Sequence, residues 1–179
     1  MTSKWLFLRW ALLISLVLAF NLIIMALGWF MEIGNLDRTF ISYTIIIIFW
    51  AITAYSGFLT WKVDCLIDDR HLGPIMLGQT LDKIEHQADN IKYAENLSER
   101  LGMLGTVCGF LMMLLGAGGF SEIQSTDTKK VMQLIEQLGV GLSTAFLTTL
   151  VGAVCGIILG IQHRNLSRAI ERKMDEIKK

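Results

Sequence analysis

The chain alternates between long apolar runs and shorter polar segments. Apolar runs extend over about residues 10–30, 40–61, 101–120 and 138–161, and none contains Asp, Glu, Lys, Arg or His. A helix of roughly 20 residues crosses the hydrocarbon core of a bilayer. An unpaired backbone amide in lipid costs several kcal/mol, so we expect each run to form a helix rather than a strand. The pattern therefore predicts an all-α integral membrane protein with four transmembrane helices.

Two of the polar segments have a helical pattern of their own. Between the second and third runs, Leu72-Gly73-Pro74 should end any helix from the second run, because proline cannot donate the helical hydrogen bond. Apolar residues then recur at helical spacing with charged residues between them: Leu77, Leu81, Ile84, Ala88, Ile91, Ala94 and Leu101. After the fourth run, a shorter stripe contains Leu166, Ile170, Met174 and Ile177. We expect both segments to be amphipathic helices that continue the third and fourth runs outside the membrane.

These patterns divide the chain into four parts. Residues 1–61 form an N-terminal membrane hairpin, 62–100 a cytoplasmic helical loop, 101–165 a second membrane hairpin and 166–179 a cytoplasmic helical tail. The two amphipathic stripes are expected to pack on each other or on neighbouring subunits. The other interpretation is that they bind a cytoplasmic effector, and the residues alone do not decide between the two.

Composition and charge agree with a membrane protein and give its orientation. Hydrophobic residues make up 53% of the chain, and the mean hydropathy is +0.52. Most of the 16 Lys and Arg residues lie in the N-terminus, the middle loop and the tail, and the positive-inside rule then places these three parts in the cytoplasm. The formal net charge is zero, which argues against nucleic acid as a partner. Lipid is the expected surroundings of the four helices.

The sequence offers little for catalysis or metal binding. The three cysteines form no CxxC pair, and the three histidines lie in polar segments without metal-ligand spacing. No phosphate-binding loop or nucleophile motif is present. We therefore expect no enzyme activity, no metal site and no cofactor.

The third and fourth runs carry small residues at helical spacing. In lipid, small residues at positions i and i+4 let two helix backbones approach closely. We expect the two runs to pack as a pair through glycines of both, and the positions selected for this role are Gly105, Gly109, Gly152 and Gly156.

Four threonines interrupt the same apolar runs: Thr106, Thr144, Thr148 and Thr149. A threonine in a membrane helix commonly bonds to the carbonyl of residue i−4, and this remains one interpretation for each of them. Thr106 and Thr149 are both flanked by glycines, and for these two we favour a polar lining of an ion path.

Two motifs in these runs resemble those of a known family. Leu104-Gly105-Thr106-Val107-x-Gly109 is similar to the LGTVxG core of the MotA/TolQ/ExbB family of bacterial ion-channel subunits. The segment from Ala145 to Gly152 resembles that family's matching motif on the following span. Their order, the short external connection and the basic cytoplasmic continuation also agree. The resemblance covers roughly residues 94–165, and the first two runs match only in general layout.

The resemblance implies a mechanism. Similar proteins form a homopentamer around two single-span partners of the MotB/TolR/ExbD kind in the bacterial inner membrane, and each partner brings an aspartate into the membrane. Protons or sodium ions pass between that carboxylate and the ring, and their flow drives rotation of the ring against the partner. By transfer from the matching positions, Thr106 and Thr149 would face the aspartate, and Thr148 or Thr144 would extend the path. An intramembrane carboxylate normally marks an ion path, so its absence from the four runs fits a titrating group supplied by another chain.

Some positions depart from the family pattern. TolQ- and ExbB-like members carry a glutamate at the position of Thr144, and they have a proline where this chain has Ile157 and Ile158. Four spans resemble MotA, but the loop over residues 62–100 is much shorter than that of MotA-like subunits, which argues against a flagellar role.

Two alternatives belong to other classes. A non-conducting membrane scaffold would use the glycine faces for assembly alone. A small proton-coupled transporter is disfavoured, because its coupling carboxylate would have to lie in a span.

Overall fold

The computed structural model describes residues 5–26, 40–68, 73–117 and 128–178, and nearly all of them are helical. The helices are α1 (Trp5–Ala26), α3 (Ile41–Asp68), α4 (Pro74–Ala117) and α5 (Thr128–Lys178). Each of the four is long and apolar enough to cross a membrane, so the prediction of an all-α membrane protein is confirmed. The predicted far ends of the first and third runs, Phe30 and Phe120, lie outside the described residues.

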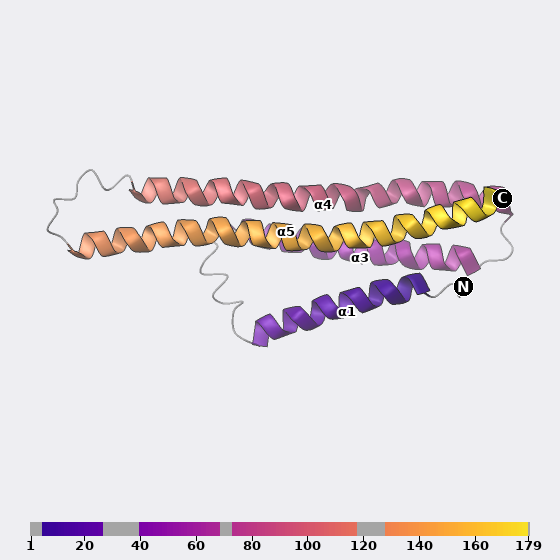
Figure 1. Cartoon of the computed structure of the whole chain (residues 1–179), viewed down its shortest axis with the longest axis horizontal. Coiled ribbons are helices and arrows are strands. Elements are labelled where there is room, and N and C mark those ends of the chain that lie inside the picture. The colour runs from indigo at the N-terminus through magenta and orange to yellow at the C-terminus, as the bar shows by residue number, and fades with distance from the viewer. Residues whose placement is uncertain (1–4, 27–39, 69–72, 118–127, 179) are drawn as a thin grey trace.

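The four helices run antiparallel to their neighbours in sequence (Figure 1). The two longest, α4 and α5, lie side by side along the molecule, α3 packs against both, and α1 packs mainly against α3. Helix α1 begins and α5 ends at the same end of the molecule (Figure 1). This arrangement is the one that an even number of membrane crossings requires.

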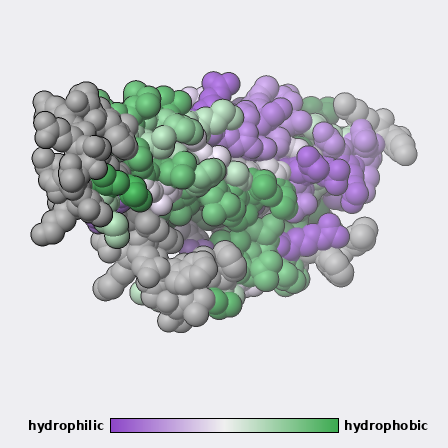
Figure 2. Space-filling model, turned by 60° about the vertical axis from the view of Figure 1, so that its left-hand side comes forward, coloured by the Kyte–Doolittle hydropathy of each residue, from purple (hydrophilic) through white to green (hydrophobic). Residues whose placement is uncertain are grey.

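Helices α4 and α5 are longer than a bilayer is thick. Their 44 and 51 residues correspond to about 66 and 76 Å at the usual rise per residue, against a hydrocarbon core of about 30 Å. The helix break expected at Pro74 is confirmed, since α4 begins there. Both amphipathic segments continue the membrane helices without interruption, as predicted. Figure 2 shows hydrophilic residues gathered toward one end of the visible face, with hydrophobic residues over most of the remaining coloured surface.

The amphipathic stripes form much of the buried core. Leu81, Ile84 and Ile91 of α4 lie in one cluster with Leu166 and Ile170 of α5, and each of these side chains is at most 1% exposed. Residues of α3 complete the cluster from the third side. The interpretation that the two stripes pack on each other is therefore confirmed. The core lies at the level of the polar extensions as well as within the apolar runs.

Candidate functional site

Two threonine side chains meet across the α4–α5 pair. The hydroxyls of Thr106 on α4 and Thr149 on α5 form a hydrogen bond with each other. Thr106 Oγ1 is also 3.1 Å from the carbonyl oxygen of Gly102. Thr149 Oγ1 is 3.1 Å from the carbonyl oxygen of Ala145 and 3.3 Å from that of Gly102. Two hydroxyls and two carbonyls thus form one cluster of four oxygens shared by the two helices.

The oxygen cluster has acceptor capacity that its own hydrogens do not fill. Each threonine hydroxyl carries one hydrogen and two lone pairs, so two hydrogens are shared among four oxygens. A cluster of this kind can accept a hydrogen bond from a protonated group, or can contribute oxygen ligands to a hard cation such as sodium. It cannot release or take up a proton near neutral pH, because none of its groups titrates there.

The threonine pair lies at the surface of an apolar face. Thr149 is exposed and Thr106 is half-buried. Met103 and Phe146 precede the two threonines by three residues, which places them on the same helix faces, and they are 62% and 70% exposed. Residues 101–117 and 138–161 contain no ionisable side chain except cysteine. The pair is therefore a polar position within a surface made for lipid or for another apolar helix.

The other two candidate threonines lie inside the helix pair. Thr144 and Thr148 are both 0% exposed. Thr144 donates to the carbonyl of Val140 at 3.0 Å, and Thr148 donates to that of Thr144 at 2.9 Å. All four threonines thus bond to a carbonyl one turn earlier, as one interpretation held. Within the described residues, Thr106 and Thr149 also form a hydroxyl pair across the two helices. A path role for Thr144 and Thr148 stays a prediction.

Glycines bring the two helix backbones together around the pair. A Cβ atom at Gly152 would lie 2.7 Å from the carbonyl oxygen of Ser98 and 2.9 Å from the Cα of Gly102. At Gly109 it would lie 2.6 Å from the backbone nitrogen of Ala145, and at Gly105 it would overlap the side chain of Thr148. Real Cβ atoms essentially never come this close, so at these positions larger residues require the helices to separate.

Gly156 lies in a different setting. A Cβ atom there would be 3.0 Å from Cγ of Glu99, which is part of a flexible and exposed side chain. The next glycine, Gly160, likewise faces the Glu95 carboxylate. The closest backbone contacts thus lie at the level of the threonine pair, and the seam opens toward the polar end.

Helix α3 carries a buried polar stripe that was not predicted from the sequence. Thr53, Ser56, Thr60 and Asp64 are at most 8% exposed, and Asp64 Oδ2 accepts a hydrogen bond of 2.8 Å from the backbone N–H of Phe7 in α1. The second apolar run was taken to end at residue 61, whereas α3 continues to Asp68. The available signal was the spacing of the four residues, which places them on one helix face.

No group of three or more His, Cys, Asp or Glu residues that could hold a metal ion occurs among the described residues.

Comparison with known proteins agrees with the geometry of the α4–α5 pair. A sequence profile of the MotA/TolQ/ExbB proton channel family matches residues 74–179, which include all of α4 and α5 and more than half of the chain. No curated protein and no solved structure matches the chain. The matched family consists of membrane proton channels rather than enzymes, and its members work in complexes with a partner. The chain belongs to the MotA/TolQ/ExbB proton channel family.

Proposed function

We propose that the chain is the ring-forming channel subunit of an ion-driven motor complex. In this proposal, protons or sodium ions pass between the Thr106–Thr149 pair and an aspartate carried by a single-span partner, and their flow drives mechanical work. The observation that carries the proposal is the oxygen cluster of the two threonines on an otherwise apolar, exposed face. A polar position of this kind is costly in lipid, and a partner helix that faces it would explain its presence.

The absence of a proton-carrying side chain from the membrane parts of α4 and α5 supports a partner chain that supplies one. The two helices that hold the threonine pair contain no Asp, Glu, Lys, Arg or His over residues 101–117 and 138–161. A channel that moves protons by protonation and release requires a titrating group at membrane depth. The carboxylate of another chain, placed against the threonine pair, supplies it. The threonine oxygens then accept the hydrogen bond of the protonated acid. When the acid is ionised, they offer oxygen ligands to a cation such as sodium.

The shape of the helix pair supports a ring. Backbone contacts at Gly109 and Gly152 fix α4 and α5 to each other on both sides of the threonine pair, so the pair is presented by a rigid unit. Large apolar side chains are exposed on the same two helices, among them Val107 and Leu150. Five copies around two partner helices would cover part of this surface and turn each threonine pair toward the centre.

The orientation in the proposal follows from the basic residues. Both termini and the loop between the second and third membrane helices lie on the cytoplasmic side of the membrane, because most Lys and Arg residues are found in these three parts. In the proposal this membrane is the bacterial inner membrane, as the family resemblance implies. The polar parts of α4 and α5 then project into the cytoplasm.

Ion flux through the reconstituted complex tests the proposal. The chain is co-expressed with the single-span protein encoded beside it, and proton or sodium uptake is measured in vesicles. We expect Thr149→Val to abolish the flux while the assembly keeps its mass, because valine keeps the volume and removes the hydroxyl. Thr44→Val is the matched control, since Thr44 is also exposed and bonds to a carbonyl four residues earlier, but lies on α3.

Unchanged flux in Thr149→Val would contradict the ion path and favour the non-conducting scaffold. Loss of flux in both variants would show that the assay reports general damage rather than the removal of an ion ligand.

A further inference from the structure

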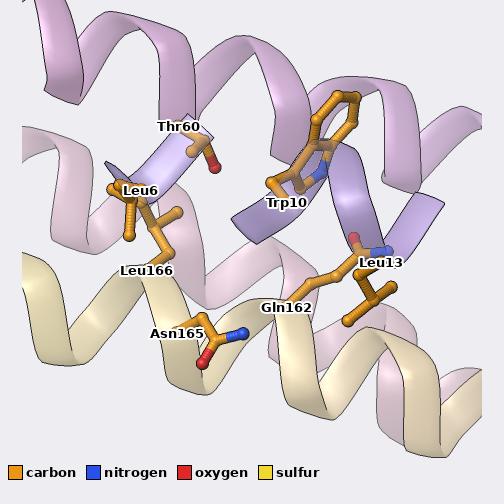
Figure 3. Close-up of a pocket in the computed structure, with 7 residues that line it drawn as sticks. All are labelled: Leu6, Trp10, Leu13, Thr60, Gln162, Asn165 and Leu166. Atoms are coloured by element: carbon orange, nitrogen blue, oxygen red, sulfur yellow. The ribbon is translucent and has the colours of Figure 1, made fainter. Parts of the chain in front are cut away.

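A small cavity lies where α1, α3 and α5 meet. Its volume is about 10 Å³. Trp10 of α1, Thr60 of α3, and Gln162 and Asn165 of α5 line it together with leucines of α1 and α5 (Figure 3). None of these residues takes part in the threonine pair. Three helices therefore bring polar side chains to one small cavity that the proposed ion path does not use.

Two buried atoms at this cavity have unused hydrogen-bonding capacity. Trp10 Nε1 and Gln162 Oε1 are buried, and neither has a hydrogen-bond partner among the described residues. The first can only donate and the second can only accept, so they are complementary. Gln162 is 3% exposed. A buried polar group without a partner is rare in native proteins, and an ordered water is a common explanation.

The two atoms are held in place by other contacts. A Cβ atom at Gly57 would overlap the ring of Trp10, so the indole lies directly on the α3 backbone. The amide nitrogen of Gln162 is 3.4 Å from the hydroxyl of Thr53, to which it donates. The carbonyl oxygen of the same amide is consequently left for a different donor.

We propose that one buried water molecule occupies this cavity and joins α1 to α3 and α5. A cavity of roughly 10–15 Å³ is what one water requires, together with two to four polar partners. The water accepts from Trp10 Nε1–H and donates one hydrogen to Gln162 Oε1. Its second hydrogen goes to Thr60 Oγ1. That hydroxyl donates its own hydrogen to the carbonyl of Ser56 at 2.8 Å, and its oxygen can accept with its lone pairs.

The water gives α1 a specific docking position. Direct contact between α1 and α5 is limited, and α1 lies outside the residues that match the family. A bridge from Trp10 to Gln162 fixes the rotation of α1 about its axis, because the Trp10 side chain projects from one face of the helix. The inference does not depend on the proposed ion path.

A high-resolution cryo-EM map of the full chain in lipid nanodiscs tests the proposal directly. We expect a density peak at roughly 2.7–3.2 Å from both Trp10 Nε1 and Gln162 Oε1, the range of ordinary hydrogen bonds. An empty cavity, or a direct hydrogen bond between the two side chains, would overturn the proposal.

A double-mutant cycle gives an independent test. Trp10→Phe removes the donor, and Gln162→Met removes the acceptor with little change in shape. We expect each to lower the thermal midpoint by roughly 2–4 °C, and the double variant to lower it by less than the sum, because both act on the same water. Trp61→Phe and Gln87→Met, at exposed positions, are the matched controls and should not shift the midpoint. Strictly additive shifts would overturn the proposal.

Discussion

The α4–α5 pair and the α1–α3 side of the molecule are held together in different ways. At Gly152 and Gly109, α4 and α5 touch backbone to backbone, so that no Cβ atom fits. Helix α1 is instead attached through side chains: Trp10 lies on Gly57, and Asp64 accepts the Phe7 amide. The family match covers only the first region. The part bearing the threonine pair is thus joined through its backbones as one unit, whereas α1 is attached from outside, mainly to α3.

This difference has a physical basis in lipid. Apolar side chains gain little by leaving hydrocarbon for a helix interface, so close backbone packing and buried polar contacts must hold membrane helices together. The α4–α5 pair is held by close backbone packing along its membrane part. The α1 junction is held by buried polar contacts: Asp64 of α3 accepts a hydrogen bond from the Phe7 amide of α1, and Thr60 and Gln162 line the cavity beside Trp10. Substitutions should therefore damage the two regions to different extents.

Gly152→Leu should have the largest effect. The new side chain meets the Ser98 carbonyl and the Gly102 backbone, neither of which can move without separating the helices, so we expect a loss of about 3 kcal/mol or more. Size-exclusion chromatography and thermal unfolding in detergent measure it. Gly139→Leu on the same helix, where a new Cβ would meet no described neighbour within 4 Å, is the control, and Gly156→Leu should cost less because Glu99 can move. Equal losses in all three variants would refute the backbone-contact account.

Thr106→Val should remove ion flux while leaving the fold intact. Valine keeps the packing but takes one hydroxyl from the oxygen cluster. Thr106→Ser keeps that hydroxyl, and we expect it to retain flux. Vesicle flux measured beside the thermal midpoint separates the two effects. If serine and valine reduced the flux equally, the hydroxyl would not be the group that matters.

Gly57→Ala should loosen α1 without affecting α4 and α5. The added methyl overlaps the Trp10 ring, and we expect a cost of about 1–3 kcal/mol. Limited proteolysis near the N-terminus should become faster, while the α4–α5 pair stays resistant. Gly78→Ala in α4, where the part of the chain that the structure describes places nothing within 4 Å of a new Cβ, serves as control. Unchanged proteolysis of α1 would mean that the ring contact is not what holds it.

Asp64→Asn should have the smallest effect. The asparagine oxygen can still accept from the Phe7 N–H, but the negative charge at the N-terminus of α1 is lost. Such charges contribute about 1 kcal/mol in partly buried positions. Thermal unfolding compared with Asp64→Ala, which also loses the acceptor, measures the two parts separately. An Asn variant that is as unstable as the Ala variant would show that the charge, not the hydrogen bond, dominates.

The sequence predicted the architecture well because its signals are local. Apolar runs, the break at Pro74 and the continuous amphipathic stripes each depend on neighbouring residues, and α4 and α5 follow them. The meeting of Thr106 with Thr149 is a contact between distant residues. Motif resemblance and the flanking glycines suggested that both residues line an ion path, but the hydrogen bond between them was not predicted. Thr144 and Thr148 are buried because of the angle at which α4 and α5 pack, and sequence periodicity does not predict that angle.

The α1 junction was not foreseen, for a related reason. Trp10 lies at the start of the first apolar run, and Gln162 lies just beyond the fourth. Neither residue suggests a partner until α1, α3 and α5 are placed together in space. Asp64 was missed because the second run was ended at residue 61, although the spacing from Thr53 through Thr60 to Asp64 marks one face of a helix.

A cryo-EM structure of the chain co-expressed with the single-span protein encoded beside it would show whether the threonine pairs face a partner. We expect a pentamer around two partner helices, with the Thr106–Thr149 pairs turned inward and a partner aspartate at their level. A complex in which these threonines face lipid, or an assembly without a central partner, would contradict the proposal.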